Sequence, residues 1–186
     1  MVGTPIGNMG DITARARDIL ARADVVACED TRVTGGLLHR LGIATRLTPY
    51  HEHNAEAARP LLLGRLQAGE AVALVSDAGM PLVSDPGYKL VRACHEAGIR
   101  VSAAPGPSAV LTALALAGLP TDRFFFAGFP PSKPGKLASF LRRVGPPSGH
   151  FGVVRGGVAP RSHLGRPGRG PGPARRRRVP RTDQAP

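Results

Sequence analysis

A chain of 186 residues with 42% apolar side chains and a net charge of +12 is long enough for one packed domain and part of a second. No apolar run approaches the roughly 18 residues of a membrane helix, no charged-then-apolar leader opens the chain, and two cysteines, Cys28 and Cys94, cannot supply a disulfide framework. These features predict a soluble, cytoplasmic protein with no membrane partner.

The first half of the chain alternates short apolar runs with helical patterns. Asp11 precedes apolar residues spaced three and four apart as far as Ala23, which is typical of an N-cap before an amphipathic helix. The expected elements are a strand stub at 1–3, a loop at 4–8, this helix, a strand at 25–28, a helix at 31–41 closed by Gly42, and a helix that begins after Asn54, runs through Leu66 and ends at Gly69.

The second half continues this alternation and then changes character. Asp85 and Pro86 together are typical of a helix start, a cap followed by a proline in the first turn. The expected elements are a strand at 71–75, a helix from Asp85 to Ala97 stopped by Gly98, a strand at 99–103, a helix from Ser108 to Gly118, a strand at 124–126, a loop at 130–136 and a short basic helix at 137–144.

Strands that alternate with helices indicate parallel βαβ units, so we predict an α/β fold with an open, mostly parallel sheet and flanking helices. In such folds ligands bind outside the carboxyl ends of the strands. Three loops rich in glycine, proline and small polar residues follow strands here, at 4–8, 76–85 and 105–108. Each alone can be an ordinary turn, but we expect the three to converge at one sheet edge and form one site.

Six motifs occur in an order and spacing that resemble one family. They lie at 3–8 (GTPIGN), 29–32 (EDTR), 51–54 (HEHN), 76–87 (SDAGMPLVSDPG), 105–109 (PGPSA) and 118–124 (GLPTDRF). Any one of them is weak. Together, from residue 1 to about 145, they resemble the tetrapyrrole-methylase superfamily, in the branch that methylates a ribose 2′-hydroxyl of small-subunit ribosomal RNA.

The resemblance implies an activity and a division of the chain. Residues 1–120 are expected to form a tetrapyrrole-methylase-like N-terminal α/β domain, and 121–145 the beginning of a truncated second α/β domain. The implied cofactor is S-adenosyl-L-methionine, the implied acceptor is a cytidine of 16S rRNA in the small ribosomal subunit, and the implied assembly is a homodimer. A tetrapyrrole (precorrin-type) C-methyltransferase on the same fold is an alternative, as is an inactive truncated remnant.

The three loops supply the candidate cofactor residues. A glycine at position 79 would let the backbone approach the ligand closely, and Asp77 or Asp85 can accept hydrogen bonds or favour the cationic sulfonium. The expected cofactor-binding residues are Pro5, Gly7, Asp77, Ala78, Gly79, Pro81, Leu82, Ser108 and Ala109.

Three neighbouring residues are the catalytic candidates: Glu29, Asp30 and Arg32. Methyl transfer to a hydroxyl gains from positioning and from removal of a proton, which Asp30 or Glu29 can accept. Arg32 can hold a phosphate with two hydrogen bonds. Asp30 can equally be a helix N-cap before Thr31, and the two roles are compatible.

His51 and His53 flank Glu52 in a pattern that can suggest a metal ion. Residues two apart converge on one ion only on a strand or in a special loop, and no further Cys/His set accompanies them. We therefore predict no metal and a polar loop that contacts RNA or a partner subunit.

Most of the net positive charge lies at the end of the chain. Residues 146–186 hold nine arginines, one acid and one leucine, too few apolar groups to offset the entropy of ordering. A reading frame shifted by one nucleotide would let 150–155 encode Thr-Leu-Val-Leu-Phe-Glu, similar to a strand in the family's second domain. We expect 146–186 to be a disordered, out-of-frame tail; a native basic RNA-binding arm is the alternative.

Overall fold

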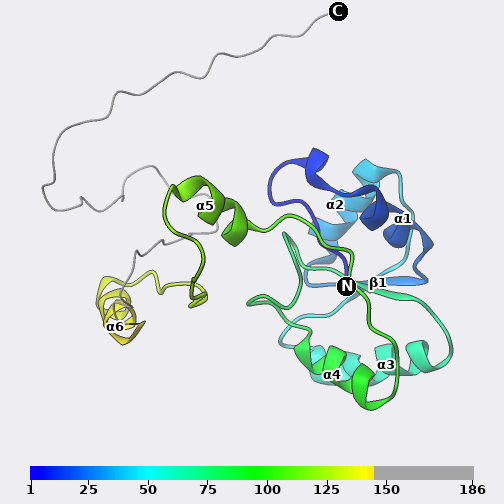
Figure 1. The fold of residues 1–186 in the computed structure, drawn as a ribbon. Helices are drawn as coiled ribbons and strands as arrows, with labels where there is room; N and C mark the ends of the chain where they lie inside the picture. Colours follow the sequence, from blue (N-terminus) through cyan, green and yellow to red (C-terminus); the bar gives the residue numbers. More distant parts are fainter. Residues whose placement is uncertain (145–186) are drawn as a thin grey trace, which may run out of the picture. The chain divides into compact units, whose positions relative to one another are not determined.

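The computed structural model describes residues 1–144 (Figure 1). Four helices surround a small parallel sheet and two more follow it along the chain. In chain order the elements are a 3-10 turn η1 (Met9–Asp11), α1 (Ala14–Arg22), β1 (Val25–Cys28), α2 (Thr31–Leu41), β2 (Leu47–Pro49), α3 (Ala55–Gln67), β3 (Val72–Leu74), α4 (Tyr88–Glu96), α5 (Ala109–Ala117) and α6 (Pro134–Val144).

The sheet has the order β2-β1-β3, and both pairings are parallel. Val26 is paired with Leu47 on one side and with Ala73 on the other, so β1 is the central strand. Because parallel strands need crossover connections, helices must cover both faces. The predicted fold class, an open parallel sheet with flanking helices, is confirmed.

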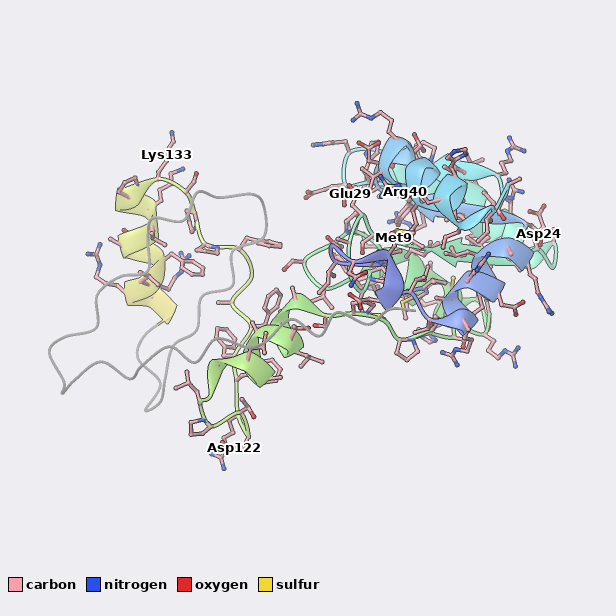
Figure 2. All side chains as sticks on the ribbon, turned by 90° about the horizontal axis from the view of Figure 1, so that it is seen from above. Met9, Asp24, Glu29, Arg40, Asp122 and Lys133 are labelled. Atoms are coloured by element: carbon pink, nitrogen blue, oxygen red, sulfur yellow. The ribbon has the colours of Figure 1, made fainter. Side chains whose placement is uncertain are left out.

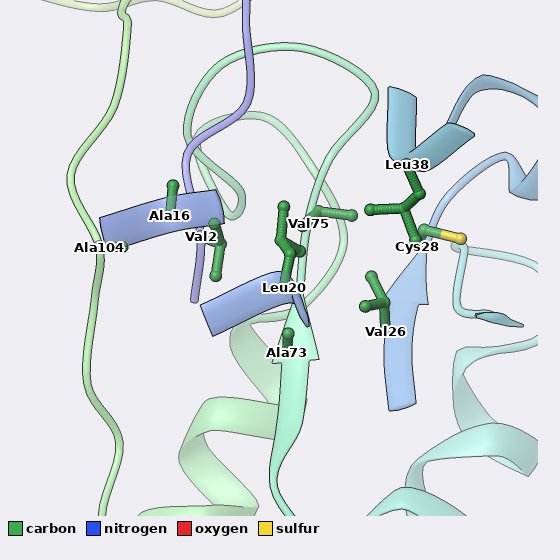
Figure 3. Packing of buried hydrophobic residues seen from close by; sticks show 9 residues of the cluster. All are labelled: Val2, Ala16, Leu20, Val26, Cys28, Leu38, Ala73, Val75 and Ala104. Carbon is green, nitrogen blue, oxygen red and sulfur yellow. The ribbon is translucent and has the colours of Figure 1, made fainter. Parts of the chain in front are cut away.

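Alternate residues of β1 divide the core into two layers. All four residues of β1 are fully buried, which is expected of a parallel strand covered on both faces. Val26 and Cys28 pack with residues of α1 and α2, including Leu20 and Leu38 (Figure 3). Val25 and Ala27 face the other layer, whose buried residues come mainly from α3 and α4.

Two segments outside the named strands extend the sheet beyond β3. The backbone N–H of Val2 donates to the carbonyl of Leu74 at 2.9 Å. On its other side the N-terminal segment bonds to Ala104, whose N–H donates to Met1 at 2.9 Å and whose carbonyl accepts from Gly3 at 3.0 Å. Val2 and Ala104 thus form a parallel bridge, and loops 4–8 and 105–108 begin at the same edge.

Several predicted elements are confirmed. The strand at 25–28 and the helix at 31–41 have the expected bounds, and Gly42 closes the helix in the left-handed conformation with φ 68°. Ser108 caps α5, accepting a hydrogen bond from the N–H of Leu111 at 3.3 Å.

Three predicted helix starts were wrong. Asp11 lies in η1, and Thr13 caps α1 instead, because its hydroxyl accepts from the N–H of Ala16 at 3.0 Å. Asp85 and Pro86 remain in a loop, and α4 begins only after Gly87, whose φ of 137° redirects the chain. The last helix begins at Pro134 rather than at 137, so it takes in part of the predicted loop.

Two predicted strands were wrong, and one strand was missed. Residues 99–103 form no strand; this stretch meets the N-terminal segment through the isolated bridge between Val2 and Ala104 and a bond from the Met1 amine to the Ser102 carbonyl. Phe124–Phe126 is irregular and at least 38% exposed, with no partner segment among the described residues. The missed strand is β2, whose three residues include Pro49 and show no apolar alternation.

The predicted tail at 146–186 lies outside the described residues, and the domain boundaries stay predictions. Within residues 1–144, the helices are too short or too polar for any of them to cross a membrane.

A glycine pair provides a test of the sheet edge. A Cβ on Gly106 would lie 2.8 Å from the Cα of Gly3, a backbone atom that no rotamer change can move. We expect Gly106→Ala to destabilise the fold by about 1–3 kcal/mol, the usual cost of overpacking. Gly36→Ala, in α2 with open space around the new methyl, is the control and should be neutral or stabilising by up to about 1 kcal/mol. Urea unfolding followed by circular dichroism measures both, and equal effects would contradict the close packing.

Candidate functional site

The three glycine-rich loops are held together by backbone contacts. Thr4 and Gly79 exchange hydrogen bonds of 2.9 and 3.1 Å, which join the loop at 4–8 to the loop after β3. Gly3 and Gly106 approach so closely that a Cβ on either would lie under 3.0 Å from the backbone of the other. A Cβ on Gly79 would touch the carbonyl of Pro107 at 3.6 Å. The expected convergence of the three loops is confirmed.

Two buried hydroxyl groups fix the base of this loop cluster. Thr4, 1% exposed, donates from its hydroxyl to the carbonyl of Ser76 at 3.1 Å. Ser76, 4% exposed, donates in turn to the carbonyl of Ala78 at 3.3 Å. Buried hydroxyls without partners are costly, so these bonds stabilise the turn after β3 in one conformation. Thr4 and Ser76 lie in two of the loops predicted from the sequence, but no sequence pattern marks either hydroxyl as a structural support.

The loop after β3 contains unusual backbone conformations. Leu82 and Ser84 have φ of 76° and 62°, values that residues with a side chain rarely adopt. They are the two non-glycine residues with positive φ in the part of the chain that the structure describes. Such strain persists only where surrounding contacts enforce it, and it is concentrated at ligand-binding sites. The strained segment belongs to the motif that the sequence analysis assigned to the cofactor.

Carboxylates gather at the carboxyl ends of β1 and β3. Glu29 and Asp30 directly follow β1, and the carboxylate of Asp77, after β3, accepts a hydrogen bond from the N–H of Asp30 at 3.2 Å. Asp85, from the same loop as Asp77, lies near enough to influence the ionisation of Glu29. This acidic cluster of Glu29, Asp30, Asp77 and Asp85 gives the edge a negative potential.

Asp30 acts as a helix cap in this structure. Its Oδ1 accepts from the backbone N–H of Arg32 at 2.8 Å and from the Nε of Arg32 at 3.0 Å, while Oδ2 accepts from the guanidinium at 2.6 Å. These bonds to Arg32 lower the pKa of Asp30 to about 2. A carboxylate so stabilised in its charged form is a poor proton acceptor.

Glu29 has the opposite electrostatic environment. Partial burial raises its pKa, Asp77 and Asp85 raise it further through repulsion, and His51 opposes the shift. Partial burial likewise raises the pKa of Asp85, which the Ser76 hydroxyl partly offsets. Of the two carboxylates considered from the sequence as bases, Glu29 is thus the one whose pKa lies above its ordinary value.

His51 stands beside Glu29 with one unused polar atom. The backbone N–H of Tyr50 donates to the carbonyl of Cys28 at 2.7 Å, so the residues after β2 run alongside the residues after β1. Asn54 holds this turn: its Oδ1 accepts from the N–H of His51 at 2.8 Å and its amide donates to Pro49 at 3.0 Å. The Nδ1 of His51 is buried without a partner.

The predicted cofactor residues occupy different positions in the loop cluster. Gly79 and Pro81 are buried, Pro5, Leu82 and Ser108 are half-buried, and Gly7, Asp77, Ala78 and Ala109 are exposed. The hydroxyl of Ser108 already accepts the hydrogen bond that caps α5. Asp77 and Ala78 are therefore accessible from solvent, whereas Gly79 and Pro81 lie beneath the surface.

His51 and His53 pack edge-on, with ring centroids 6.1 Å apart. Within residues 1–144, no three metal-ligating side chains come together in a group that could hold an ion.

These features define an α/β domain with a candidate site at the carboxyl edge of a parallel sheet. Residues 1–145 match the family model described as Tetrapyrrole (Corrin/Porphyrin) Methylases, and the chain belongs to this family.

Proteins with similar sequences share one name. The chain is 61% identical over 144 residues to "Ribosomal RNA small subunit methyltransferase I" of Mesorhizobium japonicum, covering 77% of this chain and 49% of that protein. It is 56% identical over 133 residues to the protein of the same name in Escherichia coli O157:H7, covering 72% and 46%. The chain thus spans about half the length of these relatives.

A solved structure supports the fold. The uroporphyrin-III-C-methyltransferase of Thermus thermophilus superposes with a TM-score of 0.50 at 29% identity, covering 66% of this chain and 52% of that one. The shared architecture agrees with the sheet described above.

The cap at Asp30 predicts a pH-dependent contribution to stability. Because its pKa is depressed to about 2, its stabilising effect is present above the ordinary carboxyl value and is lost as the pH falls towards 2. We expect Asp30→Asn to be less stable than the parent at neutral pH and to approach it in acid. Urea unfolding across a pH series tests this, with Asp18→Asn, which removes an exposed ion pair to Arg22, as control. A difference that does not change with pH would contradict the assignment.

Proposed function

We propose that this chain carries the S-adenosyl-L-methionine site of an RNA methyltransferase that modifies the ribose 2′-hydroxyl of a cytidine in 16S rRNA of the small ribosomal subunit. The observation that carries the proposal is the meeting of three loops and four carboxylates at one sheet edge. The names of the relatives support ribosomal RNA as the substrate class. A homodimer in the cytoplasm remains part of the proposal.

The donor set at this edge fits the cofactor. S-adenosyl-L-methionine supplies an electrophilic methyl group on a cationic sulfonium, and the acidic cluster favours a cation at this edge. Asp77 and the backbone at Ala78 face solvent and can hold the polar groups of the ligand, while Gly79 admits close approach. Pro5, Gly7, Pro81, Leu82, Ser108 and Ala109 complete the proposed wall.

Glu29 is the proposed proton acceptor. The pKa of Glu29 is raised, which makes its carboxylate a stronger base. Such a carboxylate can accept the proton of a hydroxyl group while the hydroxyl oxygen forms its new bond to the methyl carbon. Asp30 orients Arg32, whose side chain is 89% exposed and can bind a phosphate of the RNA. In this proposal Glu29 removes the proton, Asp30 orients Arg32, and Arg32 binds the substrate.

One alternative retains specific support. A tetrapyrrole C-methyltransferase would use the same fold, as the Thermus thermophilus structure does. The higher identity of the ribosomal RNA methyltransferases, 61% against 29%, favours RNA as the substrate.

A second alternative is an inactive remnant. It holds if the 186-residue chain binds the cofactor but transfers no methyl group to any acceptor.

Glu29→Gln tests the proposed base. The amide keeps the shape of the side chain but cannot accept the proton, so the rate of methyl transfer to purified 30S subunits should fall on the order of a hundredfold. Asp30→Asn is the matched control and should retain most of the rate, with cofactor affinity little changed in both. If Asp30→Asn loses the greater part of the rate, the roles of the two carboxylates are reversed.

Gly79→Val tests the cofactor loop. A branched side chain at φ 83°, facing the loop at 105–108, should lower affinity for S-adenosyl-L-methionine more than tenfold, or about 1.4 kcal/mol. Gly69→Val is the matched control, because Gly69 has a similar φ of 89° but open space around it and lies in the turn after α3. Isothermal titration calorimetry that shows equal affinities for the two variants would exclude this loop as the site.

A further inference from the structure

The net positive charge of the described residues comes from one segment. Residues 1–122 contain eleven lysines and arginines and twelve carboxylates, so they are almost neutral. Residues 123–144 contain five cations and no carboxylate. The basic segment is therefore distinct from the part of the chain that forms the sheet and the loop cluster.

Among the described residues, the cations of this segment form no ion pairs. The five ion pairs of residues 1–144 are made by Arg22, Arg32, Arg65, Lys89 and Arg92, all in the neutral part. Arg123, Lys133, Lys136, Arg142 and Arg143 make none with the carboxylates of the described residues. Their charges remain available to an external anion.

Helix α6 arranges four groups of this segment along one face. Lys133 precedes the helix, its carbonyl accepting from the N–H of Leu137 at 2.9 Å, and its side chain extends outwards (Figure 2). Lys136, Phe140 and Arg143 follow at spacings of four and three, which places them on the same side. These residues and Ser139 line an open groove on the helix.

The guanidinium of Arg143 lies over the aromatic ring of this face. Its guanidinium carbon lies 6.0 Å from the centroid of Phe140, within the range of a cation–π contact. A ring beside a guanidinium offers a stacking surface for a base together with a donor for a phosphate. A helix face made only of aliphatic residues could pack into a protein core, but it would lack this combination of an aromatic ring and a guanidinium.

The placement of the lysines carries an electrostatic cost. Lys133 and Lys136 stand at the beginning of α6, where the helix dipole is positive and cations are unfavourable. No acidic residue occupies the first turn to compensate. An anion bound at this face would remove the cost, which distinguishes it from an ordinary solvated helix surface.

The proposed reaction requires such a surface. The acidic cluster of Glu29, Asp30, Asp77 and Asp85 repels a phosphate backbone, although the acceptor ribose has to reach it. Affinity for RNA comes mainly from phosphate contacts with cations. Within residues 1–144 the segment from Arg123 onwards is the part with a large excess of positive charge.

We propose that the α6 face formed by Lys133, Lys136, Phe140 and Arg143 binds the phosphate backbone of the RNA substrate, with Phe140 stacking on a base. The assignment rests on the proposed function for its choice of RNA. It adds a binding surface that is separate in sequence from the cofactor loops.

The test compares two double variants of the whole chain. Lys136→Gln with Arg143→Gln removes two cations from the face, and Arg22→Gln with Arg92→Gln removes two from exposed ion pairs elsewhere. Binding of a fluorescein-labelled single-stranded RNA is measured by anisotropy across about 50 to 200 mM salt. We expect the first variant alone to bind at least tenfold more weakly, with a salt slope lower by about 1.4. Phe140→Leu should weaken binding at least fivefold without changing the slope.

The outcomes separate the surface from the function. If the α6 variant binds RNA as the control does, while the parent chain methylates 30S subunits, this assignment is overturned and the proposed function stands. If the parent binds RNA through α6 but transfers no methyl group, the proposed function fails and the surface stands. If the α6 cations govern binding to phosphatidylserine vesicles but not to RNA, the face is a lipid surface and the proposal is wrong.

Discussion

The close approach of the backbones at Gly3 and Gly106 is the contact on which the site depends. It can form because neither residue has a side chain, and it brings the loop at 4–8 against the loop at 105–108. The exchange of hydrogen bonds between Thr4 and Gly79 adds the third loop. Sheet extension, loop convergence and the wall of the proposed cofactor site therefore share one steric requirement, and a methyl group at either glycine would disturb all three.

Electrostatics then divide the work among neighbouring carboxylates. Asp30 is committed to Arg32 and to the first turn of α2, which keeps it ionised. Glu29, one residue earlier, has no bond to Arg32 and lies near other carboxylates, Asp77 and Asp85. Its pKa is therefore raised, whereas that of Asp30 is lowered. Adjacent positions at the end of one strand thus acquire different pKa values, because Asp30 bonds to Arg32 whereas Glu29 lies near Asp77 and Asp85. Under the proposed function, this contrast lets a supporting carboxylate and a proton acceptor lie side by side.

Much of this arrangement could be predicted from the sequence, and the failures have physical causes. The apolar run at 25–28 and the glycine after Leu41 determine β1 and α2 locally, so their bounds were correct. Asp85 and Pro86 have the local chemistry of a helix start, but the helix begins only after Gly87, whose φ of 137° redirects the chain. A side chain at this position would clash with Leu74 and Leu82. The strand β2 depends on pairing with β1 rather than on its own residues.

The site shows the same limit. Loop composition predicted where the ligand-binding edge lies, since glycine and small polar residues after strands are a local signal. It could not separate Asp30 from Glu29, because the difference between their pKa values arises from Arg32, Asp77 and Asp85, residues two to fifty-six positions away.

The distribution of charge has a further consequence. An acidic reaction edge can admit a polyanion only if another surface binds that polyanion. Residues that carry charge without ion pairs, far from the carboxylates in sequence, are the natural complement to such an edge.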